Sequence, residues 1–229
     1  MSSSFINLCN RVLRRLNEVE IAAEDFDSVR GIQALVKDAA RDSIAKINQA
    51  EYEWPFNAAD HTQDLVAGQS EYTWPTFFKV ADWNSFQIQK NSTQGVGFST
   101  LRYIERDEWY QLYRDEDNES GVSGAGVPAF VFSSHGSGFG VSPSPNKPYQ
   151  VRFRYFLNFS ALENPNDISR IPDTFDSVII DGALYHLYLF KDNIESAQAA
   201  YIAFEQGIKN MQSIYINNYE KIRDRRVNF

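Results

Sequence analysis

An alternating run over residues 149–159 most constrains the fold of this 229-residue chain. Apolar side chains fall at every second position, with Phe156 as the exception: Tyr149, Val151, Phe153, Tyr155, Leu157 and Phe159. Polar residues, including Arg152 and Arg154, lie between them. Because successive side chains of a strand point to opposite faces, the run predicts a strand with one buried and one solvated face. Such a strand is typical of an antiparallel sheet.

The N-terminal part of the chain shows helical periodicity instead. The first predicted helix has Ser3 or Ser4 as its N-cap, and its apolar residues recur at spacings of three and four: Phe5, Leu8, Cys9, Val12, Leu16 and Val19. The second has Asp27 or Ser28 as its cap and carries the apolar stripe Val29, Ile32, Val36, Ala39, Ala40 and Ile47. Because a proline disfavours helix in the residue before it, Pro55 predicts that this helix ends near residues 52–54.

Helical periodicity returns near the C-terminus. Pro172 suits the first turn of a helix with the apolar residues Phe175, Val178, Ile179, Ala183 and Leu187. After a break near Asp192 and Asn193, a longer helix is predicted. Its apolar residues alternate spacings of four and three, which is typical of a heptad-like seam: Ala197, Tyr201, Phe204, Ile208, Met211 and Tyr215.

Turn residues and period-two patterns fill the middle of the chain. Residues 62–66 and 71–74 flank Gly68, which predicts a hairpin. A glycine-rich stretch, residues 134–138, predicts a second hairpin turn between apolar runs.

The fold class follows from where one period replaces the other. We predict an α+β fold in which the N- and C-terminal helices, residues 1–57 and 168–229, pack as one α-helical bundle. Residues 60–165 are expected to form an inserted antiparallel β domain.

Composition disfavours several classes of function. The chain has 22 lysines and arginines against 30 aspartates and glutamates, a net charge of −8, so a phosphate backbone would repel it. Its single cysteine, Cys9, and its three histidines form no metal-binding motif; the histidines are His61, His135 and His186. No apolar run reaches the length of a membrane span, so no membrane partner is expected.

Catalytic motifs are also missing from the sequence. Gly136, Gly138 and Gly140 superficially match a dinucleotide loop, but Pro143 and Pro145 follow where such a loop needs a helix. We therefore predict no catalytic, cofactor-binding or metal-binding residues and no enzymatic activity. A glycosidase pair of distant carboxylates would leave no local motif and stays open as an alternative.

The last twelve residues, 218–229, differ in charge from the rest of the chain. They carry four basic and two acidic groups in an otherwise acidic sequence. One interpretation is a frayed helix end whose basic groups favour the helix dipole. The other is a docking tail, because terminal aromatic and arginine side chains suit interface hot spots. Its candidate partner-binding residues are Tyr219, Ile222, Arg223, Arg225, Arg226 and Phe229.

Several short segments also occur in a distinctive order: residues 52–57, 127–130, 143–145, 149–155 and 171–175. This order resembles that of the head-to-tail adaptor proteins of tailed bacteriophages, which include tail tubular protein A of podoviruses and the tail accessory factor of P22-like phages. The resemblance covers most of the chain as a pattern of short pieces.

The resemblance implies a structural virion protein at the head–tail junction, made in the cytoplasm of the bacterial host. Its copies would form a homo-oligomeric ring, dodecameric in the family, docked between the portal protein and the tail nozzle or tube. The helical bundle would form the ring, and DNA would pass through its lumen without sequence-specific binding. Repeated negative charge around a lumen would repel DNA and so suits a passage that must not bind it.

An alternative function is a virion-associated carbohydrate-binding or cell-wall-degrading protein. A carbohydrate-binding β module would need exposed aromatic side chains, such as Trp74, Trp83 and Trp109, gathered into a platform for sugar rings. Most aromatic residues of this kind lie in a protein core instead.

Overall fold

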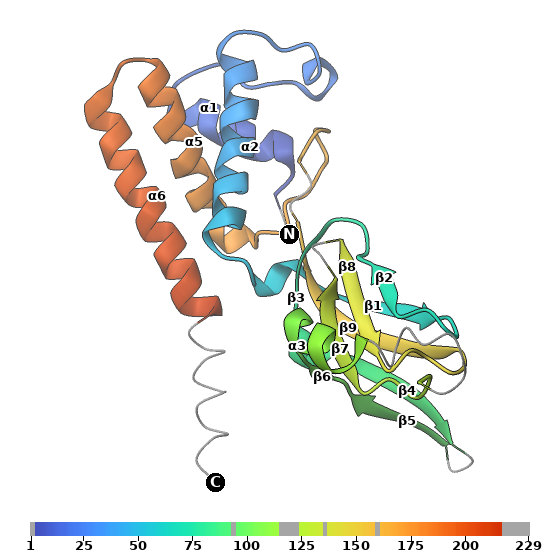
Figure 1. The fold of residues 1–229 in the computed structure, drawn as a ribbon. Helices are drawn as coiled ribbons and strands as arrows, with labels where there is room; N and C mark the ends of the chain where they lie inside the picture. Colours follow the sequence, from blue (N-terminus) through green and yellow to red (C-terminus); the bar gives the residue numbers. More distant parts are fainter. Residues whose placement is uncertain (1–2, 93–94, 115–123, 135–136, 159–160, 217–229) are drawn as a thin grey trace. The chain divides into compact units, whose positions relative to one another are not determined.

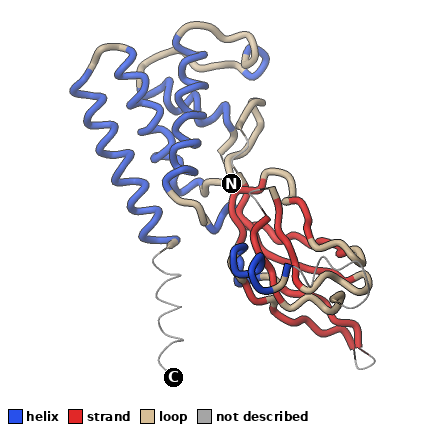
Figure 2. Tube along the Cα trace, in the orientation of Figure 1, coloured by secondary structure: helices blue, strands red, loops and turns tan. Residues whose placement is uncertain are grey.

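The computed structural model has the α+β fold that the sequence predicts (Figure 1). The residues that it describes are 3–92, 95–114, 124–134, 137–158 and 161–216. The chain divides into two compact units: a helical unit of residues 1–57 and 159–229, and a β unit of residues 58–158. Figure 2 distinguishes the helices, in blue, from the strands, in red. In the described residues, no helix combines the length and apolar character that a membrane crossing requires.

The α-helices of the helical unit come from both ends of the chain. They are α1 (Phe5–Arg15), α2 (Ile32–Ala50), α5 (Asp176–Phe190) and α6 (Ile194–Tyr215). Short 3₁₀ turns accompany them: η1 (Ala23–Asp25), η2 (Pro55–Asn57) and η4 (Asp173–Phe175). Helix α5 packs against α1, α2 and α6, so it joins the N-terminal and C-terminal helices in one core.

Helix α1 is shorter than the apolar spacing predicts. It begins after Ser4, as expected, but ends at Arg15, and Asn17 follows with a left-handed φ of 56°. Val19 was expected on the buried face and is instead 79% exposed. The chain leaves the helix before Val19, so the position no longer follows the helical period.

Helix α2 begins and ends inside its predicted bounds. Gly31, with φ of 60°, precedes its first residue, so neither Asp27 nor Ser28 is its cap. The helix ends at Ala50, several residues before Pro55. The predicted stripe faces the helical core, with Val36 and Ile47 fully buried.

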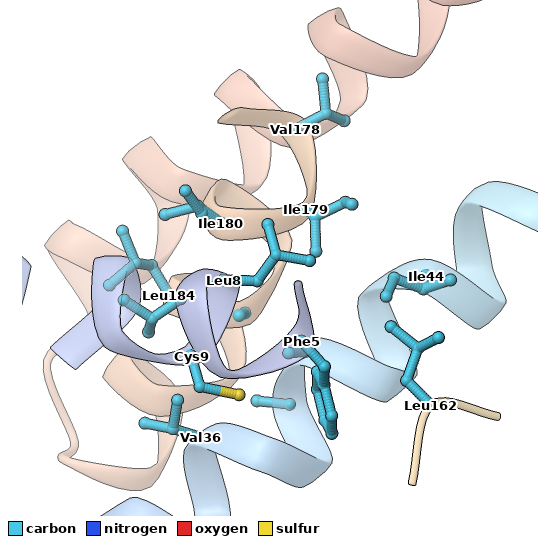
Figure 3. Packing of buried hydrophobic residues seen from close by; sticks show 14 of the residues in the cluster. Phe5, Leu8, Cys9, Val36, Ile44, Leu162, Val178, Ile179, Ile180 and Leu184 are labelled. Carbon is cyan, nitrogen blue, oxygen red and sulfur yellow. The ribbon is translucent and has the colours of Figure 1, made fainter. Parts of the chain in front are cut away.

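The core of the helical unit draws side chains from all four helices. Figure 3 shows the part of this core to which α1, α2 and α5 contribute. Phe5, Leu8 and Cys9 of α1 pack there with residues of α2 and α5. Leu162, from the segment before α5, also contributes, and Arg41 Nε donates a hydrogen bond to its carbonyl oxygen at 2.7 Å.

Two glycines allow the helices to approach closely. A Cβ atom on Gly182 of α5 would lie 2.8 Å from Ser43 Oγ of α2 and 2.7 Å from the ring of Phe204 of α6. On Gly207 of α6 it would lie 2.7 Å from Val178 of α5. Any side chain at these positions would push neighbouring helices apart.

A buried carboxylate ties the start of the chain to α5. Asp176, in the first turn of α5, is 4% exposed. Its Oδ2 accepts hydrogen bonds from Arg11 Nη1 and Ser3 Oγ, each at 2.5 Å. The Arg11 side chain remains 38% exposed, so it bridges the buried carboxylate and the solvent.

We expect Arg11→Ala to destabilise the protein by about 2 kcal/mol, because it leaves Asp176 buried without its charged partner. Arg14→Ala on the same helix is the matched control. Arg14 pairs with Glu20 in an exposed salt bridge, and its loss should cost less than about 1 kcal/mol. Denaturant unfolding of both variants measures the difference, and equal losses would contradict a structural role for the Arg11–Asp176 pair.

The β unit consists of two sheets. One contains β1 (Ala58–Leu65), β3 (Phe78–Ala81), β4 (Gln87–Ser92), β5 (Gly95–Thr100) and β9 (Tyr149–Leu157). The other contains β2 (Glu71–Thr73), β6 (Arg102–Tyr103), β7 (Phe130–Ser134) and β8 (Gly138–Ser142). A 3₁₀ turn, η3 (Trp83–Ser85), and a short helix, α3 (Arg106–Leu112), complete the unit.

Strand β9 is the centre of the first sheet. It pairs antiparallel with β1, β3 and β4, and β5 follows β4 at the edge. The alternating run therefore forms the predicted strand, with Tyr149, Val151 and Phe153 buried and Arg152 and Arg154 exposed.

One of the two predicted hairpins is wrong. The strands on either side of Gly68 do not pair with each other, because β1 pairs with β9 and β2 pairs with β8. The two strands lie in different sheets, and Gly68, with φ of 78°, turns the chain from one to the other. The second prediction is confirmed, since β7 and β8 pair antiparallel.

The two sheets enclose the main core of the β unit. This core contains Phe139 of the second sheet. It also contains side chains on or just beside strands of the first sheet: Phe86, Ile88, Val151 and Phe153. Behind the second sheet, Trp109 of α3 stacks on Phe132 with ring centroids 4.3 Å apart. Helix α3 thus covers the outer face of the second sheet.

Candidate assembly surface

The predicted docking tail lies outside the described residues, which end at residue 216. The structure therefore places none of its candidate partner-binding residues: Tyr219, Ile222, Arg223, Arg225, Arg226 and Phe229. Helix α6 ends at Tyr215, just before this segment.

Helix α6 has one buried and one outward face. Phe204, Ile208 and Met211 of the predicted seam are buried, but Tyr201 is 45% exposed. Tyr201 lies at the border of the seam, with its ring centroid 5.2 Å from that of Tyr185. The prediction of a buried seam is thus correct at most of its positions and wrong at this one.

The outward face of α6 carries little charge. Only three of the 22 residues of the helix are charged: Glu195, Glu205 and Lys209. Ile202, near the middle of the face, is 67% exposed, and small side chains such as Ala199 and Ala203 flank it. Removing such a face from water costs little, because few charged groups lose their hydration.

The turn between α5 and α6 adds exposed apolar side chains. Leu189, Phe190 and Ile194 are 44%, 65% and 65% exposed. Lys191 Nζ donates to Glu18 Oε1 at 2.9 Å, which ties the turn to the segment after α1. We call the combined region the hairpin surface, and its apolar residues are Leu189, Phe190, Ile194, Ala199, Ile202 and Ala203. Grouped exposed apolar residues of this kind mark interaction sites.

The described histidines have packing partners. The His61 ring lies 5.5 Å from the ring of Phe153. His186 is half-buried, with Nε2 3.2 Å from Lys46 Nζ, and its pKa is lowered by burial and by the positive charge of Lys46. His135 lies outside the described residues. In the part of the chain that the structure describes, no group of three or more His, Cys, Asp or Glu side chains could hold a metal ion.

The proposed tryptophan platform is not formed. Trp109 is buried against Phe132 behind the second sheet. Trp74 stacks on Phe78 with centroids 4.0 Å apart, and both pack against the core of the β unit. Trp83 and Trp74 are half-buried and pack against this core, so the three tryptophans do not gather on one exposed platform.

A family model for the SU10 adaptor protein matches residues 3–226. The chain belongs to the SU10 adaptor protein family. The match spans the helical unit and the β unit together, so the family includes the inserted strands. It supports the resemblance to phage head-to-tail adaptors and names neither tail tubular protein A nor the tail accessory factor of P22-like phages. No curated protein matches the chain.

The predictions from sequence did not include the hairpin surface of this SU10 adaptor family member. The helical period directs attention to the buried seam of α6, whereas an outward face is usually assigned to solvent. A signal was nevertheless present, because residues 196–204 contain no charged side chain. Long solvent-facing helices normally carry more charge.

Cys9 should be chemically inert in the folded protein. Burial raises its pKa to about 12, although Lys37 and Arg41 act in the opposite direction. At pH 8 we expect iodoacetamide to label Cys9 only through unfolding, because the thiolate is the reactive form. Below about pH 9 the thiol is neutral in both states, so its ionisation does not change the free energy of unfolding. As pH rises from about 9 toward 12 only the unfolded thiol ionises, so the free energy of unfolding should fall. Rapid labelling under native conditions would contradict the burial of Cys9.

Proposed function

We propose that the chain is a non-enzymatic structural subunit of a tailed-phage virion, a head-to-tail adaptor at the junction between portal and tail. The single observation that carries the proposal is the family match over residues 3–226. An adaptor acts by binding neighbours on either side, so its function depends on surfaces more than on a catalytic pocket.

The adaptor copies assemble into a ring, which is dodecameric if it follows the resemblance to tail tubular protein A and the tail accessory factor. The hairpin surface supports this part of the proposal. It presents Phe190 and Ile202, both about two-thirds exposed, on a pair of packed helices. In a ring, the hairpin surface of one copy meets a different surface of the next copy. The ring closes when the rotation from copy to copy adds up to a full turn.

DNA passes through the lumen of this ring without sequence-specific contacts. The net charge of −8 supports a passage role, because each copy repels the phosphate backbone. Repetition of that charge around a ring strengthens the repulsion.

One pair of neighbouring carboxylates does not fit the alternative of a cell-wall-degrading enzyme. On the solvated face of the first sheet, Asp60 and Asp64 lie four residues apart on β1. At 3.3 Å per residue, this spacing is about 13 Å, whereas glycosidase carboxylates lie about 5–9.5 Å apart. The membership of an adaptor family also supports a non-enzymatic role.

Ile202→Glu tests the proposed ring contact. We expect the variant to fold normally, because Ile202 is exposed, and to lose self-assembly, because a charge would be buried between copies. Gln49→Glu, at an exposed position of α2, is the matched control for an added carboxylate. Complementation of an adaptor-deficient phage, followed by electron microscopy of the particles, reads out the result.

If Ile202→Glu particles contain complete rings, the hairpin surface is not the contact between copies. If Gln49→Glu also prevents assembly, the defect follows from added charge rather than from its position. Circular dichroism of both purified variants verifies that each retains its helices.

The tail over residues 218–229 docks onto the portal protein in this proposal. Its arginines would pair with carboxylates of the portal, and Phe229 would fill an apolar pocket. We expect removal of residues 219–229 to leave the melting temperature unchanged and to prevent attachment to portal-containing heads. Normal attachment, or a large drop in the melting temperature of the truncated subunit, would show that the tail has no docking role.

A further inference from the structure

The solvated face of the first sheet carries an ordered row of side chains from four strands. The pairing places Asp64 of β1 opposite Gln150 of β9, Gln150 opposite Gln89 of β4, and Gln89 opposite Phe98 of β5. Direct cross-strand partners share a face, so the four side chains lie side by side. Phe98 is 43% exposed at the end of the row.

Neighbouring contacts hold parts of this face in place. Gln150 Nε2 donates to Asp64 Oδ1 at 3.0 Å. In the adjacent row, Arg152 donates through Nε and Nη2 to Gln87 Oε1, at 2.9 and 2.6 Å. The guanidinium carbon of Arg152 lies 3.6 Å from the ring centre of Phe98. Side chains that are already ordered lose less entropy when a ligand binds.

A cavity of about 560 Å³ opens beside this row. Its lining residues are Asp64, Gln89, Lys147, Pro148, Tyr149 and Gln150. The volume falls in the range of small-molecule sites. Its lining includes carboxylate, amide and ammonium groups beside Pro148 and Tyr149, so a wholly apolar ligand would leave the polar groups without partners.

Among the described lining residues, the two charged groups are of opposite sign. Asp64 contributes one negative charge and Lys147 one positive charge. Further along the face, Arg154 pairs with Asp60 at 3.4 Å. Arg152 adds a positive charge in the adjacent row, where its guanidinium donates to Gln87 Oε1. The lining itself carries one charge of each sign, and its amide and carboxylate groups can bond a neutral polar ligand.

The polar groups of the row are complementary to the hydroxyl groups of a sugar. A hydroxyl donates one hydrogen bond and accepts others, and adjacent hydroxyls can pair with an amide or a carboxylate. Gln89 and Gln150 supply amides, and Asp64 supplies a carboxylate, in one row. Phe98 packs with the Arg152 guanidinium and is still 43% exposed, so its remaining apolar surface lies at the end of that row for the C–H groups of a sugar ring.

We propose that the row Asp64–Gln150–Gln89–Phe98 and the adjoining cavity bind a neutral saccharide. The site shares no residue with the hairpin surface and does not depend on the adaptor function. It also differs from the tryptophan platform considered above, because its polar contacts come from strands β1, β4 and β9.

Ligand-observed NMR with the full-length chain tests the proposal. The probes are trisaccharides of glucose, of mannose and of N-acetylglucosamine, with a sialylated trisaccharide and inorganic phosphate as charged comparisons. We expect at least one neutral trisaccharide to bind at or below about 10 mM. Asp64→Asn should weaken that binding about tenfold, because a charged acceptor is replaced by a neutral amide with one acceptor oxygen fewer.

Asp60→Asn is the matched control, since it makes the same change on the same strand and face but outside the cavity lining. We expect it to leave saccharide binding unchanged, and Phe98→Ala to weaken the binding. The proposal is overturned if no neutral trisaccharide binds, if both aspartate variants bind equally well, or if the charged probes bind preferentially.

Particle assembly separates this proposal from the adaptor function. Asp64→Asn should assemble as the unchanged protein does. If it instead prevents assembly and no saccharide binds, the face belongs to a protein interface and the saccharide proposal fails.

Discussion

The close approach of three helices at Gly182 is the constraint on which the helical unit depends. A side chain there would collide with Ser43 of α2 and Phe204 of α6, so α5 packs tightly between helices from both ends of the chain. The Arg11–Asp176 pair adds a polar link from α1 to the first turn of α5. Because the chain ends are held together in this way, the strands between them form a separate unit without interrupting the helical core.

Local periodicity predicted the elements better than their partners. The alternating run predicted a strand that begins at Tyr149, as β9 does, and β9 ends at Leu157. The heptad-like spacing identified the buried side of α6. The hairpin around Gly68 was wrong because β1 pairs with β9, about 90 residues away in the sequence. Pairing over that distance is decided by how two sheets enclose a core, which no local pattern records.

The candidate surfaces likewise depend on packing and strand pairing that local sequence patterns do not record. The charge-poor stretch 196–204 is visible in the sequence, but only the packed position of α6 shows that Ile202 faces outward. The saccharide row joins residues of four strands, and its register cannot be read before the pairing is known. The docking tail rests on composition alone, because it lies outside the described residues.

A protein of this kind acts through the contacts of its surfaces, in keeping with its membership of the SU10 adaptor protein family. The low charge of α6 and the acidic composition of the whole chain suit two parts of the proposed function, contact between copies and repulsion of DNA. Cryo-electron microscopy of the complete virion is the most direct test of the account. We expect a ring of this chain beside the portal, between head and tail. Density for the chain elsewhere in the particle, with none beside the portal, would contradict the adaptor function.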